Sequence, residues 1–113
     1  IMQFQYIVIG AYVANDNVSA GLVYIAKGED DGLQKKVELA FAVPAEYADQ
    51  GIGQALLRVA EETILQVIGP CNVHVETLRT NHAMRAVMSA RDRTGKGVPD
   101  DDSVLTYDYV LAA

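Results

Sequence analysis

The segment from Ala40 to Glu62 reads AFAVPAEYADQGIGQALLRVAEE, and its pattern changes twice along its length. It begins as an apolar run, passes through Pro44 and a short polar stretch, and reaches Gly51-Ile52-Gly53 just before an amphipathic pattern. Glycine costs a helix about 1 kcal/mol relative to alanine. Two glycines in the first turn of a predicted helix therefore need a reason, and a ligand bound at the end of that helix would supply one.

The apolar run belongs to a predicted strand over residues 35–43. Alternation places Val37, Leu39, Phe41 and Val43 on one face and Glu38, Ala40 and Ala42 on the other. Pro44 ends the pairing because proline has no N–H to donate. Two further strands are predicted upstream, over residues 3–13 and 18–27, and the polar stretch GEDDG at 28–32 predicts a hairpin.

The amphipathic pattern predicts a helix that starts at Gly51 and stops at the Gly-Pro pair at 69–70. Its apolar stripe is predicted to consist of Ile52, Leu56, Val59, Thr63 and Val67, and its polar face of Arg58, Glu61, Glu62 and Gln66. A strand over 71–78, a helix over 80–93 capped by Thr80 or Asn81, a loop and a strand over 103–112 follow. The order β-β-β-α-β-α-β predicts an α+β fold, with a mixed, mostly antiparallel sheet and two helices.

Composition narrows the class of protein. The 113 residues suit one domain, and half of them are hydrophobic, which is enough for one core. A net charge of −6 disfavours nucleic acid and anionic membranes as partners. The single cysteine, Cys71, cannot form an internal disulfide, which favours a cytoplasmic location. No metal site is predicted, because His74 and Glu76 make a pair of ligands without a third.

The glycines have two interpretations. A helix N-terminus carries unpaired N–H groups and a partial positive charge, and anions bind there. The segment from Ala48 to Gln54 could then surround a pyrophosphate with successive amides. Alternatively, Gly51 only tightens a turn, and Gly53 only lets the helix pack close to a strand.

The wider context resembles the acyl-CoA-binding motif of the GCN5-related N-acetyltransferase (GNAT) superfamily. Downstream, TNHAMRAVM resembles that superfamily's later segment, in which an asparagine opens a helix lining the CoA arm. Upstream, VELAFAV resembles its central strand, where several members carry a glutamate as general base. These segments are most similar in sequence to the bacterial protein-lysine acetyltransferase branch, and the resemblance covers about residues 18 to 90.

The resemblance implies a function, a cofactor and a set of site residues. Residues 1–113 would form one GNAT-like domain that transfers an acetyl group directly from acetyl-CoA to an amine, either a small molecule or a protein lysine. The cofactor would lie where the third and fourth strands splay apart. Its pantetheine arm would pair with Ala42 and Val43, and Asn81 would touch the CoA arm. Glu38 would be the general base, and the pyrophosphate would sit on the amides of Gln50, Gly51, Ile52, Gly53 and Gln54.

The chain also departs from the pattern of the superfamily. The usual N-terminal strand and helices are not recognisable, and the final hairpin is predicted to be reduced to one strand. Ala48 offers no side-chain donor, Asp49 adds a negative charge, and Met88 stands where many members have a tyrosine that acts as an acid. Two alternatives therefore stay open: a non-catalytic CoA-binding or dimeric interaction module, and a plain α+β domain. A homodimer is expected, because a sheet edge needs covering.

Overall fold

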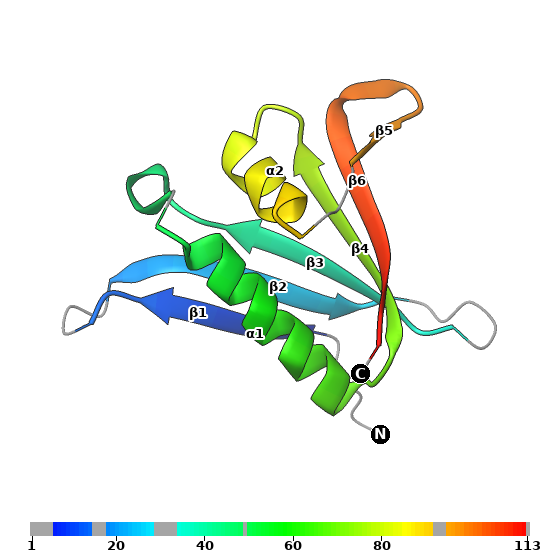
Figure 1. Ribbon diagram of the computed structural model, residues 1–113, viewed down its shortest axis with the longest axis horizontal. Coiled ribbons are helices and arrows are strands. Elements are labelled where there is room, and N and C mark those ends of the chain that lie inside the picture. Colours follow the sequence, from blue (N-terminus) through cyan, green and yellow to red (C-terminus); the bar gives the residue numbers. More distant parts are fainter. Residues whose placement is uncertain (1–5, 15–17, 29–33, 49, 92–94, 113) are drawn as a thin grey trace.

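The computed structural model describes residues 6–14, 18–28, 34–48, 50–91 and 95–112. Within these ranges the chain forms one mixed sheet, in the order β1-β2-β3-β4-β6-β5, with two α-helices and one 3-10 turn (Figure 1). The elements are β1 (Tyr6–Tyr12), β2 (Ser19–Lys27), β3 (Lys36–Ala42), η1 (Ala45–Tyr47), α1 (Ile52–Val67), β4 (Cys71–Leu78), α2 (His82–Ser89), β5 (Lys96–Val98) and β6 (Asp101–Leu111). The predicted α+β class is confirmed, as is the predicted order of elements except for the addition of β5.

The prediction for the C-terminal part was wrong in one respect. The segment predicted as a loop contains β5, which pairs antiparallel with β6, so the final hairpin is not reduced to one strand. Asp100 closes this hairpin with a φ of 70°, a left-handed conformation that aspartate tolerates better than most residues. The hairpin was missed because its strand β5 has only three residues and lies in a sequence that is polar and rich in turn formers.

The two central strands, β3 and β4, run parallel and pair over only four residues each, from Lys36↔Asn72 to Leu39↔Val75. Beyond that point β3 continues along β2 to Ala42, while β4 continues along β6 to Leu78. Their carboxyl-terminal ends therefore separate, as predicted, and Figure 1 shows them diverging. We call this gap between residues 40–42 and 76–78 the fork.

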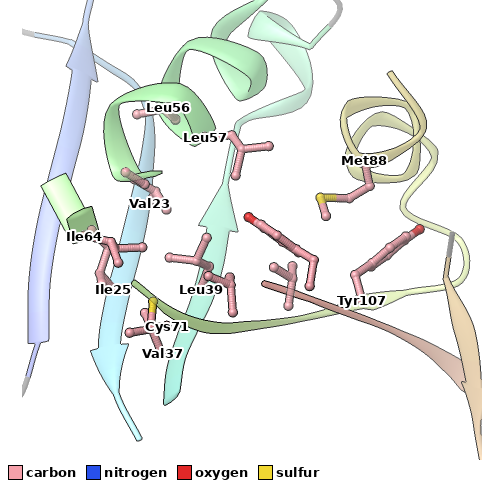
Figure 2. Packing of buried hydrophobic residues seen from close by; sticks show 14 of the residues in the cluster. Val23, Ile25, Val37, Leu39, Leu56, Leu57, Ile64, Cys71, Met88 and Tyr107 are labelled. Atoms are coloured by element: carbon pink, nitrogen blue, oxygen red, sulfur yellow. The ribbon is translucent and has the colours of Figure 1, made fainter. Parts of the chain in front are cut away.

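Both described helices pack on the same face of the sheet, which we call the inner face. Figure 2 shows side chains of α1, α2 and the strands meeting there in one core. The largest fully buried members are Val23, Ile25, Val37, Leu57, Ile64, Val73, Val75 and Met88. The opposite, outer face carries exposed side chains that include Tyr6, Val8 and Tyr24.

The predicted orientation of α1 was wrong in part, because Leu56 and Ile52 of the predicted stripe pack in or against the core but Val59 and Val67 do not. The buried residues of the helix are Leu56, Leu57, Ala60, Glu61 and Ile64. Of the predicted stripe, Val67 is 53% exposed and Val59 is 36% exposed. The helix offers two apolar ridges at similar spacing, and the ridge through Leu57 and Ile64 is the one that faces the sheet.

Glu61 lies on that buried ridge rather than on the polar face where it was predicted. Its carboxylate accepts a hydrogen bond from Arg91 Nη2 at 2.5 Å and another from the Tyr109 hydroxyl at 2.9 Å. A buried carboxylate is tolerated when it is paired and hydrogen-bonded in this way. The three residues tie α1 to the segment after α2 and to β6.

Candidate functional site

A cavity of about 250 Å³ lies at the open end of the fork, between the end of β3, the start of α1 and the helix α2. Among the predicted cofactor residues, Val43, Gly51, Ile52, Gly53, Gln54 and Asn81 line it, together with Phe41, Tyr47, Ala48, Ala83, Met84, Ala86 and Val87. The side chain of Ala42 lies on the outer side of β3, and the Gln50 side chain donates to the Glu46 carbonyl at 3.2 Å. The contacts predicted for these two residues are through the backbone and stay predictions. The structure thus gathers most of the predicted cofactor residues around one cavity.

The first turn of α1 leaves backbone donors without acceptors. The earliest bond of this turn runs from Ala55 N to Gly51 O at 3.0 Å, and no side chain caps the helix. Across the described ranges, the amides of Ile52, Gly53 and Gln54 have no hydrogen-bond acceptor. Unpaired amides at a helix N-terminus, aided by the helix dipole, favour an anion.

The two glycines have different roles. Gly51 precedes the helix with a φ of 80°, and a Cβ there would meet nothing within 4 Å, so its backbone conformation is what favours glycine. At Gly53 a Cβ would lie 2.8 Å from Val87 Cγ2. Gly53 therefore allows close packing, but against α2 rather than against a strand. Gln54 Nε2 donates to the Val87 carbonyl at 3.1 Å and joins the two helices at the same place.

Asn81 is the N-cap of α2, and its Oδ1 accepts a hydrogen bond from Met84 N at 3.0 Å. The capping role predicted from the sequence is therefore confirmed, while contact with a CoA arm stays a prediction. Met84 and Met88 of α2 are buried and belong to the core. Of two tyrosines that could line a cleft, Tyr47 lines this cavity and Tyr24 is exposed on the outer face. Asp49, whose negative charge was noted in the sequence, lies outside the described residues.

Glu38 lies on the other side of the sheet. Its neighbours in the register are Ala26 on β2 and His74 on β4, and its side chain is exposed on the outer face. A hollow of about 220 Å³ opens there, lined by Ala26, Glu38, Leu39, Ala40, His74 and Glu76. The surroundings of Glu38 in this hollow are therefore both polar and apolar. Its role as a base stays a prediction.

His74 is held by carboxylates at both ring nitrogens. Nδ1 lies 2.6 Å from Asp108 Oδ1, and Nε2 lies 3.1 Å from Glu76 Oε1. Partial burial by itself lowers the pKa of His74, but the two hydrogen bonds and the two negative charges outweigh it, so the pKa is raised. This raised pKa stabilises the fold fully below about pH 6.5, and the stabilisation is lost as the pH rises through the folded-state pKa.

The sequence predicted the proximity of His74 and Glu76 but missed Asp108. Asp108 lies directly opposite His74 in the β4–β6 register, 34 residues further along the chain. The available signal was the alternation on β6, where Asp108 stands between the buried Tyr107 and Tyr109 and so must point outward. Cys71, by contrast, is buried, and burial raises the pKa of its thiol.

The comparisons with known proteins rest on structure. No family profile matches the sequence, and no curated protein does. The chain is similar to a solved GNAT-family acetyltransferase from Streptococcus pneumoniae, with 16% identity, a TM-score of 0.76, and coverage of 96% of this chain and 68% of the other. A phosphinothricin acetyltransferase of the GNAT superfamily from Sinorhizobium meliloti, solved with AcCoA, matches with 15% identity, a TM-score of 0.74 and coverages of 95% and 62%.

The ribosomal-protein-S18-alanine N-acetyltransferase from Escherichia coli has 16% identity and a TM-score of 0.71, over 99% of this chain and 73% of its own. The chain therefore spans about two thirds of the length of these solved proteins. Neither described helix has the length and hydropathy that crossing a bilayer requires. The six-stranded sheet that opens at a fork between parallel strands, with a helix starting at its mouth, matches these structures over nearly all of the chain, and the chain has the fold of the GNAT acetyltransferases.

Proposed function

We propose that this chain binds acetyl-CoA in the cavity at the fork and transfers the acetyl group directly to an amine. The observation that carries the proposal is that the amides of Ile52, Gly53 and Gln54, at the open end of the fork, have no hydrogen-bond acceptor among the described residues. These donors suit a pyrophosphate, which is the charged part of the cofactor. The three solved neighbours named above are acetyltransferases, which supports acyl-CoA as the ligand class.

The fork suits the pantetheine arm. Past Leu39, β3 has no partner on its β4 side, so part of its backbone is available on that edge. The pantetheine arm is an extended chain with two amide groups, and it would pair with β3 near Ala42 and Val43 as an added strand does. The proposed path leads from these residues to the amides of α1, and it passes Asn81 at the start of α2.

Transfer requires a neutral amine and a polarised thioester carbonyl. A backbone N–H near Val43 is proposed to polarise the carbonyl, because it lies where β3 leaves the sheet. Glu38 is proposed to face the acceptor ammonium from the outer side of the fork. Met88 is fully buried and has no proton to donate, so the leaving thiolate takes its proton from the amine or from water.

Acetyl-CoA is expected to raise the melting temperature of the protein by about 10 °C at 100 times its dissociation constant, since such binding adds about 2.7 kcal/mol. Gly53→Val should abolish this shift, because a branched side chain at Gly53 would collide with Val87 and crowd the free amides. Ala55→Val, the same new side chain on the exposed side of α1, should keep it.

The same melts separate the alternatives. A rise in melting temperature with acetyl-CoA, together with release of free CoA thiol in the presence of an amine, supports the proposed enzymatic function. A shift without transfer to any primary amine supports the non-catalytic CoA-binding module. No shift at all would leave a plain α+β domain, with glycines that serve only the turn and the contact between helices.

A cytoplasmic homodimer is also proposed. The edge strand β1 carries no charged residue, and Tyr6, Val8 and Tyr12 on it are exposed. Uncharged edge strands tend to pair with another chain. Sedimentation should therefore give twice the mass of one chain, and Val8→Lys should shift the protein to the mass of a single chain, whereas Val59→Lys on the exposed side of α1 should not.

A further inference from the structure

The charged groups of the outer face gather around His74. The strand registers place Ala26, Glu38, His74 and Asp108 in one row across β2, β3, β4 and β6. Glu38 and His74 form the last pair but one before β3 and β4 separate. The imidazole therefore lies at the base of the fork, on the face opposite the two helices.

The hollow beside His74 is open to a ligand on this face. It is lined by Ala26, Glu38, Leu39, Ala40, His74 and Glu76, and the small side chains of the two alanines leave room for a ligand. His74 is about one-third exposed, so its ring can be reached from the hollow. Asp108 fixes the ring from the far side through Nδ1, which leaves Nε2 on the side of Glu76 and the hollow.

Resting on the function proposed above, we propose that His74 is the catalytic residue that takes the proton of the acceptor ammonium, with Asp108 positioning its ring. Glu38 then serves as the counter-ion that draws the ammonium into the hollow. This assigns to an imidazole the role that the resemblance gave to the strand glutamate.

The steps balance as follows. The ammonium takes the place of the contact between His74 Nε2 and Glu76. Neutral His74 then holds its proton on Nδ1 toward Asp108 and accepts the ammonium proton on Nε2, and the electron pair of the broken N–H bond stays on the amine nitrogen. The amine attacks the thioester carbon, a C–N bond forms, and the C–S bond breaks with its electron pair moving to sulfur. A second proton of the amine goes to the thiolate to give free CoA, and the imidazolium releases its proton to solvent.

Imidazole suits this task because its ordinary pKa lies nearest to neutral pH. Among the described residues, the charged groups that line the two adjoining hollows or bond to His74 are Glu38 and Lys36 of β3, Glu76 of β4 and Asp108 of β6, while β2 contributes Ala26. Three of these four groups are carboxylates, and the two that bond to His74 raise its pKa. Turnover should therefore rise with pH through an apparent pKa above the ordinary histidine value.

The test uses acetyl-CoA with spermidine and with a short lysine peptide, and it measures kcat and acceptor KM against pH. His74→Gln should lower kcat by at least about 100-fold with little change in acceptor KM, since general bases contribute about 10²–10⁴-fold. Glu38→Gln should mainly raise acceptor KM. Asp108→Asn should move the rising limb of the pH profile to lower pH, and proton NMR should show the His74 imidazole titrating lower by the same amount.

His82→Gln is the matched control, because His82 is exposed at the start of α2 and should leave kcat unchanged. If His74→Gln keeps its kcat while Glu38→Gln loses it, the proposal for His74 is overturned and acetyl transfer stands. If the unaltered protein binds acetyl-CoA but acetylates neither acceptor, both this proposal and the enzymatic function are overturned. The dispersion of the amide signals in the proton NMR spectrum reports whether each variant is folded.

Discussion

Replacing Ile64 with alanine is expected to lower the free energy of unfolding by about 3–4 kcal/mol. Ile64 lies on the inner side of α1 and is fully buried, in a core that includes Val23, Ile25 and other strand side chains (Figure 2). Removing three carbon atoms loses their transfer free energy and leaves a cavity that the surrounding strands fill only in part. Urea denaturation monitored by circular dichroism would measure the loss.

Val67→Ala is the control for this measurement. Val67 lies in the last turn of α1 and is 53% exposed, so its loss should stay within about 0.5 kcal/mol, as is usual for surface substitutions. The two variants together test the orientation of α1. Equal losses, or a larger loss at Val67, would mean that the helix presents the ridge predicted from the sequence.

Glu61→Ala is expected to cost about 3 kcal/mol, close to the effect at Ile64. The change leaves the Arg91 guanidinium without its carboxylate and removes the acceptor of the Tyr109 hydroxyl. Breaking a buried ion pair by removing one partner typically costs 3–5 kcal/mol, and the value is placed at the low end because Arg91 is one-third exposed. The loss should be read from urea denaturation at neutral pH.

Two further variants refine this result. Glu62→Ala, at the exposed neighbouring position, should change stability by less than about 0.5 kcal/mol. Glu61→Gln keeps an oxygen that can accept from Tyr109 but loses the charge. Its loss of unfolding free energy should therefore lie between those of Glu61→Ala and Glu62→Ala. A Glu61→Ala protein as stable as Glu62→Ala would contradict the buried arrangement of Glu61.

The elements of the fold that could be predicted are those set by local patterns. Alternation along β3 gave its two faces correctly, and the Gly-Pro pair marked the end of α1. The orientation of α1 could not be predicted, because two ridges of the helix have similar hydrophobicity and only the sheet selects between them. Glu61 reads as a surface residue in any local window, since its partners Arg91 and Tyr109 lie 30 and 48 residues away.

The candidate site also has features that local sequence predicts and features that depend on how distant segments pack. Gly51 and the free amides after it could be predicted, because they depend on the first turn of one helix. The contact of Gly53 with Val87 and the bond from Asp108 to His74 depend on how distant segments pack and on strand register. The resemblance suggested the fork, but the sequence did not show that Glu38 would be exposed beside a histidine fixed by two carboxylates.

The short pairing of β3 with β4 has a mechanical consequence. It divides the sheet into two leaves, β1-β2-β3 and β4-β6-β5, which share only four residue pairs at one end. At the other end the leaves are bridged by helices, where Gly53 and Gln54 of α1 meet Val87 of α2. A ligand bound in the fork would therefore contact both leaves and add to the few contacts that hold them together.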